Sequence, residues 1–159
     1  MIMTIGLFGT CGNSTWRKEF IETYKFNDVE FFNPQVDDWS PELAEVEAEH
    51  LANDEIILFP VLAETSGLGS LGEVGFSILQ AIKLDSTRNV IVMIDKNCDI
   101  EDEAVKKESI RARALVMAHL KKLKYPNVYL VENLSDMLDL SLKLHAIEVI
   151  RKGFDKYRL

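Results

Sequence analysis

The sequence predicts an α/β fold in which helices cover both faces of a five-stranded parallel sheet. Five short apolar runs recur along the 159 residues, and each is continuous rather than alternating with polar residues. Continuous apolar runs of this length are typical of strands that are covered on both faces. Helical patterns fill the intervals and no Pro/Gly/Ser-rich linker interrupts them, so we expect a single domain over residues 1–159.

The elements follow one another in strict alternation. We expect strands at residues 3–8, 29–32, 55–62, 89–94 and 127–131. We expect helices at residues 15–25, 41–52, 70–83, 101–123 and 134–152. Ser40 is typical of an N-cap, and Pro41 of a first helical residue. Caps for the first helix are available at residues 13–15.

Seven of the eight glycines fall into two clusters, one at the first strand and one after the third: Gly6, Gly9 and Gly12, then Gly67, Gly69, Gly72 and Gly75. Five such strands suit a flavodoxin-like three-layer sandwich with strand order 2-1-3-4-5. In such sheets ligands bind beyond the carboxyl ends of the strands where the order reverses, here between the first and third strands. The two glycine clusters therefore predict the two loops that flank a binding site.

Composition excludes several classes of function. The net charge of −8 and the lack of a Lys/Arg stripe argue against binding to a nucleic-acid polymer. No apolar run reaches the length of a membrane span, and the N-terminus does not resemble a signal peptide. Two cysteines without ligand spacing and three scattered histidines predict no metal site. We expect a cytoplasmic protein.

The stretch GLGSLGEVG at residues 67–75 places one carboxylate, Glu73, at the start of a helix. Ser70 and Glu73 fit a capping box, in which the glutamate binds the N-cap amide. Alternatively, Glu73 is a nucleophile or a charge stabiliser at the mouth of the site. The same stretch matches the dinucleotide fingerprint GxGxxG, with Asp95 after the next strand. However, it follows the third strand, and residues 63–66 separate it from that strand.

The loop after the first strand, GTCGNSTWRKEF at residues 9–20, leads into a helix. Its amides, with Ser14 and Arg17, are suited to holding a phosphate or sugar hydroxyls. The alternative is ordinary capping, with Trp16 and Phe20 packed in the core. Cys11 fits a small buried residue.

The loop FFNPQVDDWSPE at residues 31–42 carries aromatic and acidic side chains. Trp39 and Phe32 could stack on a planar base, and Asp37 or Asp38 could hydrogen-bond a base or a sugar. The alternative is that the Asn and Asp residues form side-chain turns. The next helix carries four glutamates, one of which could point over the site: Glu42, Glu45, Glu47 and Glu49.

Three segments, LFGTCGNSTWR at 7–17, FFNPQVDDW at 31–39 and SGLGSLGEVGFSI at 66–78, resemble the nucleoside 2-deoxyribosyltransferase-like family in its divergent branch. The resemblance implies a flavodoxin-like fold, no cofactor and homo-oligomers built from dimers. It also implies an enzyme that moves deoxyribose between bases through a covalent glutamate intermediate, with a nucleoside or nucleotide and a free base as partners. By motif position Glu73 is the nucleophile.

The same resemblance assigns the remaining roles. The second acid is sought among Asp37, Asp38, Glu47 and Glu64, of which Asp38 and Glu47 are preferred. The base lies against Phe8, Trp39 and the Asn33 loop, and Ser14 and Arg17 hold the 5′ end. The expected substrate contacts are Phe8, Gly9, Thr10, Cys11, Ser14, Arg17, Asn33, Pro34, Asp37, Trp39, Thr65, Ser66, Gly67 and Gly69.

Besides a dinucleotide-binding redox domain, which the GxGxxG match would indicate, two further functions stay open. The first is hydrolysis of a nucleoside 5′-monophosphate, which an Arg17 side chain facing the site would favour. The second is a non-catalytic nucleotide-binding or sensor domain on the same fold.

Overall fold

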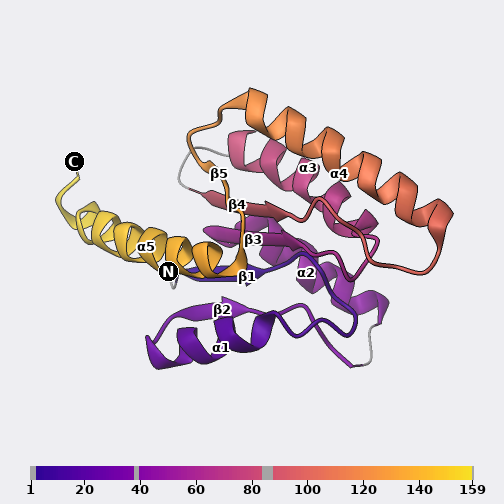
Figure 1. The fold of residues 1–159 in the computed structure, drawn as a ribbon. Coiled ribbons are helices and arrows are strands. Elements are labelled where there is room, and N and C mark those ends of the chain that lie inside the picture. The colour runs from indigo at the N-terminus through magenta and orange to yellow at the C-terminus, as the bar shows by residue number, and fades with distance from the viewer. Residues whose placement is uncertain (1–2, 38–39, 84–87, 159) are drawn as a thin grey trace.

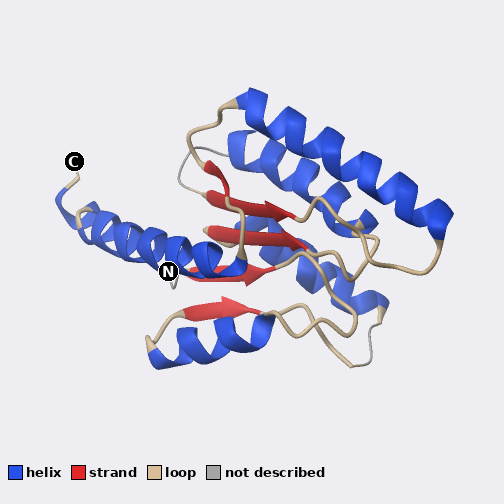
Figure 2. Ribbon diagram, in the orientation of Figure 1, coloured by secondary structure: helices blue, strands red, loops and turns tan. Residues whose placement is uncertain are grey.

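The structure is a computed structural model that describes residues 3–37, 40–83 and 88–158. Five parallel strands form one sheet in the order β2-β1-β3-β4-β5 (Figures 1 and 2). The strands are β1 Thr4–Leu7, β2 Glu30–Phe32, β3 Ile56–Val61, β4 Asn89–Ile94 and β5 Val128–Leu130. The predicted flavodoxin-like α/β sandwich and its strand order are confirmed.

The order of the strands reverses at β1, which pairs with β2 on one side and with β3 on the other. Ile5 lies opposite Phe31 in β2 and opposite Ile56 in β3. All six residues of β3 are buried, as expected of a central strand covered on both faces. The carboxyl ends of β1 and β3 therefore lie side by side, where the sequence places the two glycine clusters.

Helices cover both faces of the sheet. They are α1 Arg17–Phe26, α2 Pro41–Asn53, α3 Leu68–Lys83, α4 Glu103–Leu123 and α5 Leu134–Gly153, followed by a short 3₁₀ turn, η1 Asp155–Tyr157. Apolar side chains of α2, α3 and α4 pack into the core on one face, and those of α1 and α5 pack into the core on the other. Within the described ranges no helix is both long and apolar enough to cross a membrane.

Each helix starts within two residues of its predicted position, and the predicted cap is found at α2 but not at α1. Ser40 is the N-cap of α2 and Pro41 is its first residue. Side chains also cap two later helices: Asp102 accepts hydrogen bonds at the start of α4, and Asn133 does so at the start of α5. Helix α1 begins at Arg17, after Trp16, so residues 13–15 lie before its N-cap position and do not cap it.

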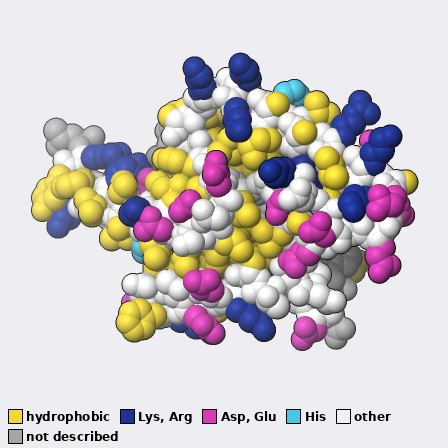
Figure 3. All heavy atoms as spheres, viewed as in Figure 1, with side chains coloured by type: hydrophobic (Ala, Val, Ile, Leu, Met, Phe, Trp, Pro, Cys, Tyr) yellow, Lys and Arg dark blue, Asp and Glu magenta, His cyan; other side chains and the backbone are white. Residues whose placement is uncertain are grey.

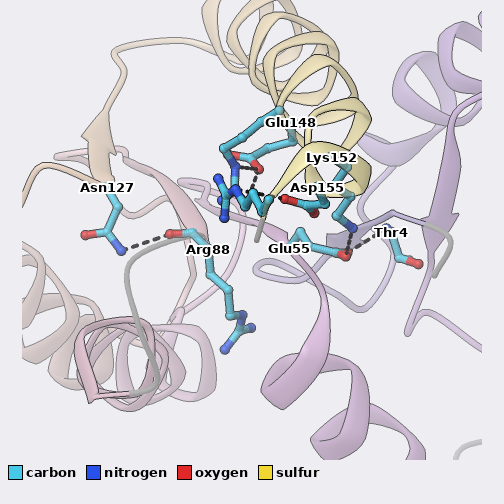
Figure 4. Close-up of polar contacts among 9 residues, drawn as sticks. Thr4, Glu55, Arg88, Asn127, Glu148, Lys152 and Asp155 are labelled. Atoms are coloured by element: carbon cyan, nitrogen blue, oxygen red, sulfur yellow. Dashed lines mark hydrogen bonds and ion pairs between the residues drawn. The ribbon is translucent and has the colours of Figure 1, made fainter.

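The amino edge of the sheet is closed by structural contacts (Figure 4). Glu55 accepts a hydrogen bond from the amide of Thr4 and forms an ion pair with Lys152, which ties the end of α5 to the start of β3. Arg88 donates to the carbonyls of Leu51 and Asp54 at the end of α2. These contacts join the amino ends of β1, β3 and β4 to helices α2 and α5.

Tyr24 on α1 and Ser141 on α5 share a buried hydrogen bond of 2.6 Å between their hydroxyl oxygens. The substitution Tyr24→Phe should lower the free energy of unfolding by about 1 kcal/mol, because a buried hydrogen bond is lost while Ser141 still donates to the carbonyl of Leu138. Urea denaturation measures the change. Tyr157→Phe is the matched control, since Tyr157 is 72% exposed and should show no effect. Equal losses in the two variants would contradict this account.

Candidate functional site

Arg17 organises the loop after β1. Its side chain is 2% exposed although it carries a charge. Its nitrogens donate to the carbonyls of Leu7, Phe8 and Thr10 at 2.7–3.2 Å, and Nη2 also lies 3.3 Å from the Cys11 sulfur. Burial lowers the pKa of Arg17, while Cys11 and two glutamates described below act in the opposite direction. Arg17 therefore stabilises the loop after β1 through hydrogen bonds to its backbone carbonyls.

The loop also depends on Gly9 and Thr10. Gly9 has a φ of +85°, and a Cβ there would lie 2.6 Å from the carbonyl oxygen of Pro60, so only glycine fits. The amide of Thr10 donates to that same Pro60 carbonyl, and its hydroxyl accepts from the amide of Leu62. The loop after β1 is thus bonded directly to the end of β3.

A second buried arginine, Arg113 on α4, holds the loop after β3. It is 1% exposed and donates to the backbone carbonyls of Val61, Leu62, Thr65 and Asp95. Its Nε donates to the hydroxyl of Ser109, which donates in turn to the carbonyl of Ser66. The predicted contact residues Thr65 and Ser66 are therefore held through their carbonyl oxygens.

Helix α3 begins two residues before the expected capping box. Its first residue is Leu68, and the amide of Leu71 already donates to the carbonyl of Gly67. Ser70 lies inside the first turn rather than at the N-cap, so the capping-box interpretation of Glu73 is wrong. Glu73 lies half-buried in the second turn of α3, at the end of the helix that faces the β1 loop.

Glu73 lies within electrostatic reach of Glu47 on α2 and of Arg17. Burial raises the pKa of Glu73, the negative charge of Glu47 raises it further, and Arg17 lowers it. Burial also raises the pKa of Glu47, and Arg17 again acts in the opposite direction. Both carboxyl groups therefore keep a proton to a higher pH than an ordinary glutamate does. Of the predicted catalytic residues, Glu47 and Glu73 lie close enough for the charge of Glu47 to raise the pKa of Glu73.

The loop after β2 borders this region. The Asn33 side chain accepts from the amide of Gln35, and Nε2 of Gln35 donates to the carbonyls of Gly12 and Ser14. Pro34 is buried and Asp37 is exposed. Asp38 and Trp39 lie outside the described residues, so their predicted roles in catalysis and base stacking stay predictions.

The structure shows the surroundings of three predicted contacts, Phe8, Cys11 and Ser14. Phe8 is 2% exposed and packs against Phe59 and Phe32 at ring distances of 5.7 and 5.8 Å, so it belongs to the core and does not offer a face to a base. Cys11 is exposed rather than a buried filler. Ser14 is buried, and its hydroxyl has no hydrogen-bond partner among the described residues.

The glycines of α3 do not form a dinucleotide-binding turn. Gly67 fits a tight turn, with a φ of +68° and Val61 only 2.5 Å from where a Cβ would lie. At Gly69 and Gly72, however, a Cβ would meet no described atom within 4 Å. The third glycine of the fingerprint allows a helix to approach a strand closely, and that packing is missing here.

Sequence reasoning missed Arg113, Ser109 and Gln35. A signal for the first two was present, because Ser109, Arg113 and Leu120 follow helical spacing along the buried stripe of α4. A charged residue on such a stripe requires internal partners. Nothing in the local pattern distinguishes Gln35 from an ordinary turn residue.

Neither a known relative nor a metal site among the described residues identifies the function of this chain. Comparisons with protein-family models, with curated proteins and with solved structures found no match. Among the residues that the structure describes, no group of three His, Cys, Asp or Glu side chains is placed to hold a metal ion.

Replacing Arg17 tests its structural role. Arg17→Lys should lower the free energy of unfolding by about 3 kcal/mol, because one ammonium cannot reach the carbonyls of Leu7, Phe8 and Thr10 together. Guanidinium denaturation measures the loss, with Arg111→Lys on the exposed side of α4 as the matched control. A loss below about 1 kcal/mol would show that the loop carbonyls do not depend on Arg17.

The Glu47–Glu73 pair predicts a pH-dependent stability. A raised carboxyl pKa means that the folded state binds more protons than the unfolded state, so stability falls as the pH rises from the ordinary glutamate pKa through the raised one. Glu73→Gln should therefore stabilise the protein at pH 7 by roughly 0.5–1 kcal/mol, and have little effect near pH 4. Thermal denaturation at the two pH values measures this. The exposed Glu64→Gln is the control, and stabilisation of equal size at both pH values would contradict the pairing.

Proposed function

We propose that this protein cleaves the N-glycosidic bond of a nucleoside and transfers the deoxyribose to a second base, through a covalent ester on Glu73. The pairing of Glu73 with Glu47 beyond the carboxyl ends of β1 and β3 carries the proposal. The two acids come from different helices, interact electrostatically and have raised pKa values. Glycoside cleavage with retention requires two carboxyl groups with distinct roles.

In the first step a carboxylate oxygen of Glu73 attacks C1′ of the sugar. The bond between C1′ and the base nitrogen breaks, its electron pair stays with the nitrogen, and Glu47 supplies a proton to the leaving base. In the second step a nitrogen of the acceptor base attacks C1′ and the ester electrons return to Glu73. The proton lost by the acceptor passes to Glu47. Water in place of the acceptor gives hydrolysis.

The charge balance of the site suits this sequence of steps. The mechanism requires Glu47 and Glu73 to hold one proton between them. Their raised pKa values favour keeping that proton at pH values above the ordinary glutamate pKa. Positive charge that develops at C1′ favours an ionised Glu73, which leaves the proton on Glu47. Arg17 lowers the pKa of both acids and so opposes double protonation.

The surroundings favour an uncharged nucleoside over a 5′-monophosphate. Arg17 already donates to three backbone carbonyls, so it is not free to bind a phosphate. Glu47 and Glu73 add negative charge to the same region, which would repel a phosphate. A nucleoside substrate therefore agrees better with the contacts of Arg17.

The test is base exchange on a panel of deoxynucleosides, each with a free acceptor base, followed by chromatography. We expect Glu73→Gln to lower kcat by roughly 10³-fold or more, and Glu47→Gln by roughly 10²-fold. Glu64→Gln should retain full activity. In the wild type, kcat/KM should fall on the acid side at a pH above the ordinary glutamate pKa, because Glu73 must be ionised.

A slow substrate with fluorine at C2′ should leave a sugar ester that mass spectrometry locates on the peptide containing Glu73. An ester on Glu47 would reverse the two roles. Activity that survives in both glutamine variants would overturn the mechanism. Calorimetric binding of nucleosides without any release of base in the wild type would instead support the nucleotide-binding sensor.

A further inference from the structure

A cavity lies between α4 and the carboxyl ends of β4 and β5, apart from the candidate site. Its volume is about 960 Å³, which is within the range of pockets that hold small organic molecules. It exists because α4 packs against α3, while β5 is an edge strand of three residues. Figure 1 shows α4 lying beside α3, with its length extending past the end of the sheet. The end of the sheet near β5 is thus left partly uncovered.

The wall of this cavity is mostly apolar. On the face seen in Figure 3, hydrophobic side chains gather between α4 and the β5 end of the sheet, with charged side chains around them. Methionine side chains adapt to irregular ligands, and small residues on a helix leave room for one. The apolar lining includes Met93, Ala114, Met117, Ala118, Leu130 and Val131.

Charged residues complete the lining and define the kind of ligand. Asp95 and Arg113 lie together and balance each other. Lys96, Lys121 and Glu132 are exposed and leave one positive charge in excess. We propose that this cavity binds a small amphipathic anion, whose apolar body lies against Met117 and Leu130 and whose acid group faces Lys121.

Arg113 connects this cavity to the loop that leads to Glu73. The same guanidinium forms part of the cavity wall and binds the carbonyls of Leu62 and Thr65. A ligand that fills the cavity restricts the motion of Arg113, and through it the loop at residues 62–67. The binding site itself does not depend on the proposed glycosyl transfer.

The test uses 1-anilinonaphthalene-8-sulfonate, an aromatic anion that fluoresces in apolar sites, and its uncharged relative N-phenyl-1-naphthylamine. We expect the anion to bind one site per chain, with higher affinity than the uncharged probe at low salt. Lys121→Glu should weaken the anion roughly threefold to tenfold and leave the uncharged probe unchanged. Lys122→Glu is the matched control, because Lys122 is exposed beside it but does not line the cavity.

Filling the cavity provides an independent variant. Ala118→Phe should weaken both probes at least roughly tenfold, whereas Ala104→Phe, on the exposed first turn of α4, should weaken neither. The proposal is overturned if neither probe binds, or if both bind Ala118→Phe and Lys121→Glu as tightly as wild type. It is also overturned if sedimentation shows that Ala118→Phe dissociates an oligomer, because a second copy of the chain would then occupy the surface.

Hydrogen exchange tests the link through Arg113. Saturation with the anionic probe should slow exchange of the amides at residues 62–67 in wild type and in Lys122→Glu. Lys121→Glu at the same probe concentration should show a smaller effect. Unchanged exchange at saturation would overturn the link. Because neither measurement uses a nucleoside, failure here is distinct from failure of the proposed transfer reaction.

Discussion

Arg17 and Arg113 are both almost fully buried, and backbone carbonyl groups accept most of their hydrogen bonds. A guanidinium offers five donors in a fixed plane, so one side chain can bind several carbonyls that turn away from regular secondary structure. The loops after β1 and β3 contain such carbonyls, because each leaves its strand through a glycine-containing turn. Without a buried donor, these oxygens would carry a desolvation cost.

The two loops matter because they flank the point where the strand order reverses. Thr10 bonds to Pro60 and Leu62, which joins the loops to each other, and Gly9 permits the close approach. Fixed loops in turn fix the starts of α1 and α3. The buried arginines therefore position the candidate acids through the backbone of the two loops.

Whereas the buried arginines stabilise the fold, the two acids Glu47 and Glu73 destabilise it. Glu47 and Glu73 interact at partly buried positions, where loss of water and mutual repulsion both disfavour ionisation. Such an arrangement lowers the stability of the folded protein. Destabilising acids with raised pKa values are typical of functional sites. Arg17 lies close enough to moderate the repulsion while its hydrogen bonds serve the loop. One buried cation thus contributes both to folding and to the electrostatics of the proposed site.

The sequence by itself determined the fold class, the order of the elements, the two glycine loops and Glu73 as the notable acid. Strand and helix periods are local, so continuous apolar runs and helical spacing were sufficient for these. Only the tertiary structure placed Glu47 near Glu73 and Arg17, turned Arg17 inward and placed Phe8 in the core. It alone revealed Arg113, whose partner Val61 lies 52 residues away in the chain. Contacts between distant segments depend on how helices pack on the sheet, and no local pattern encodes that packing.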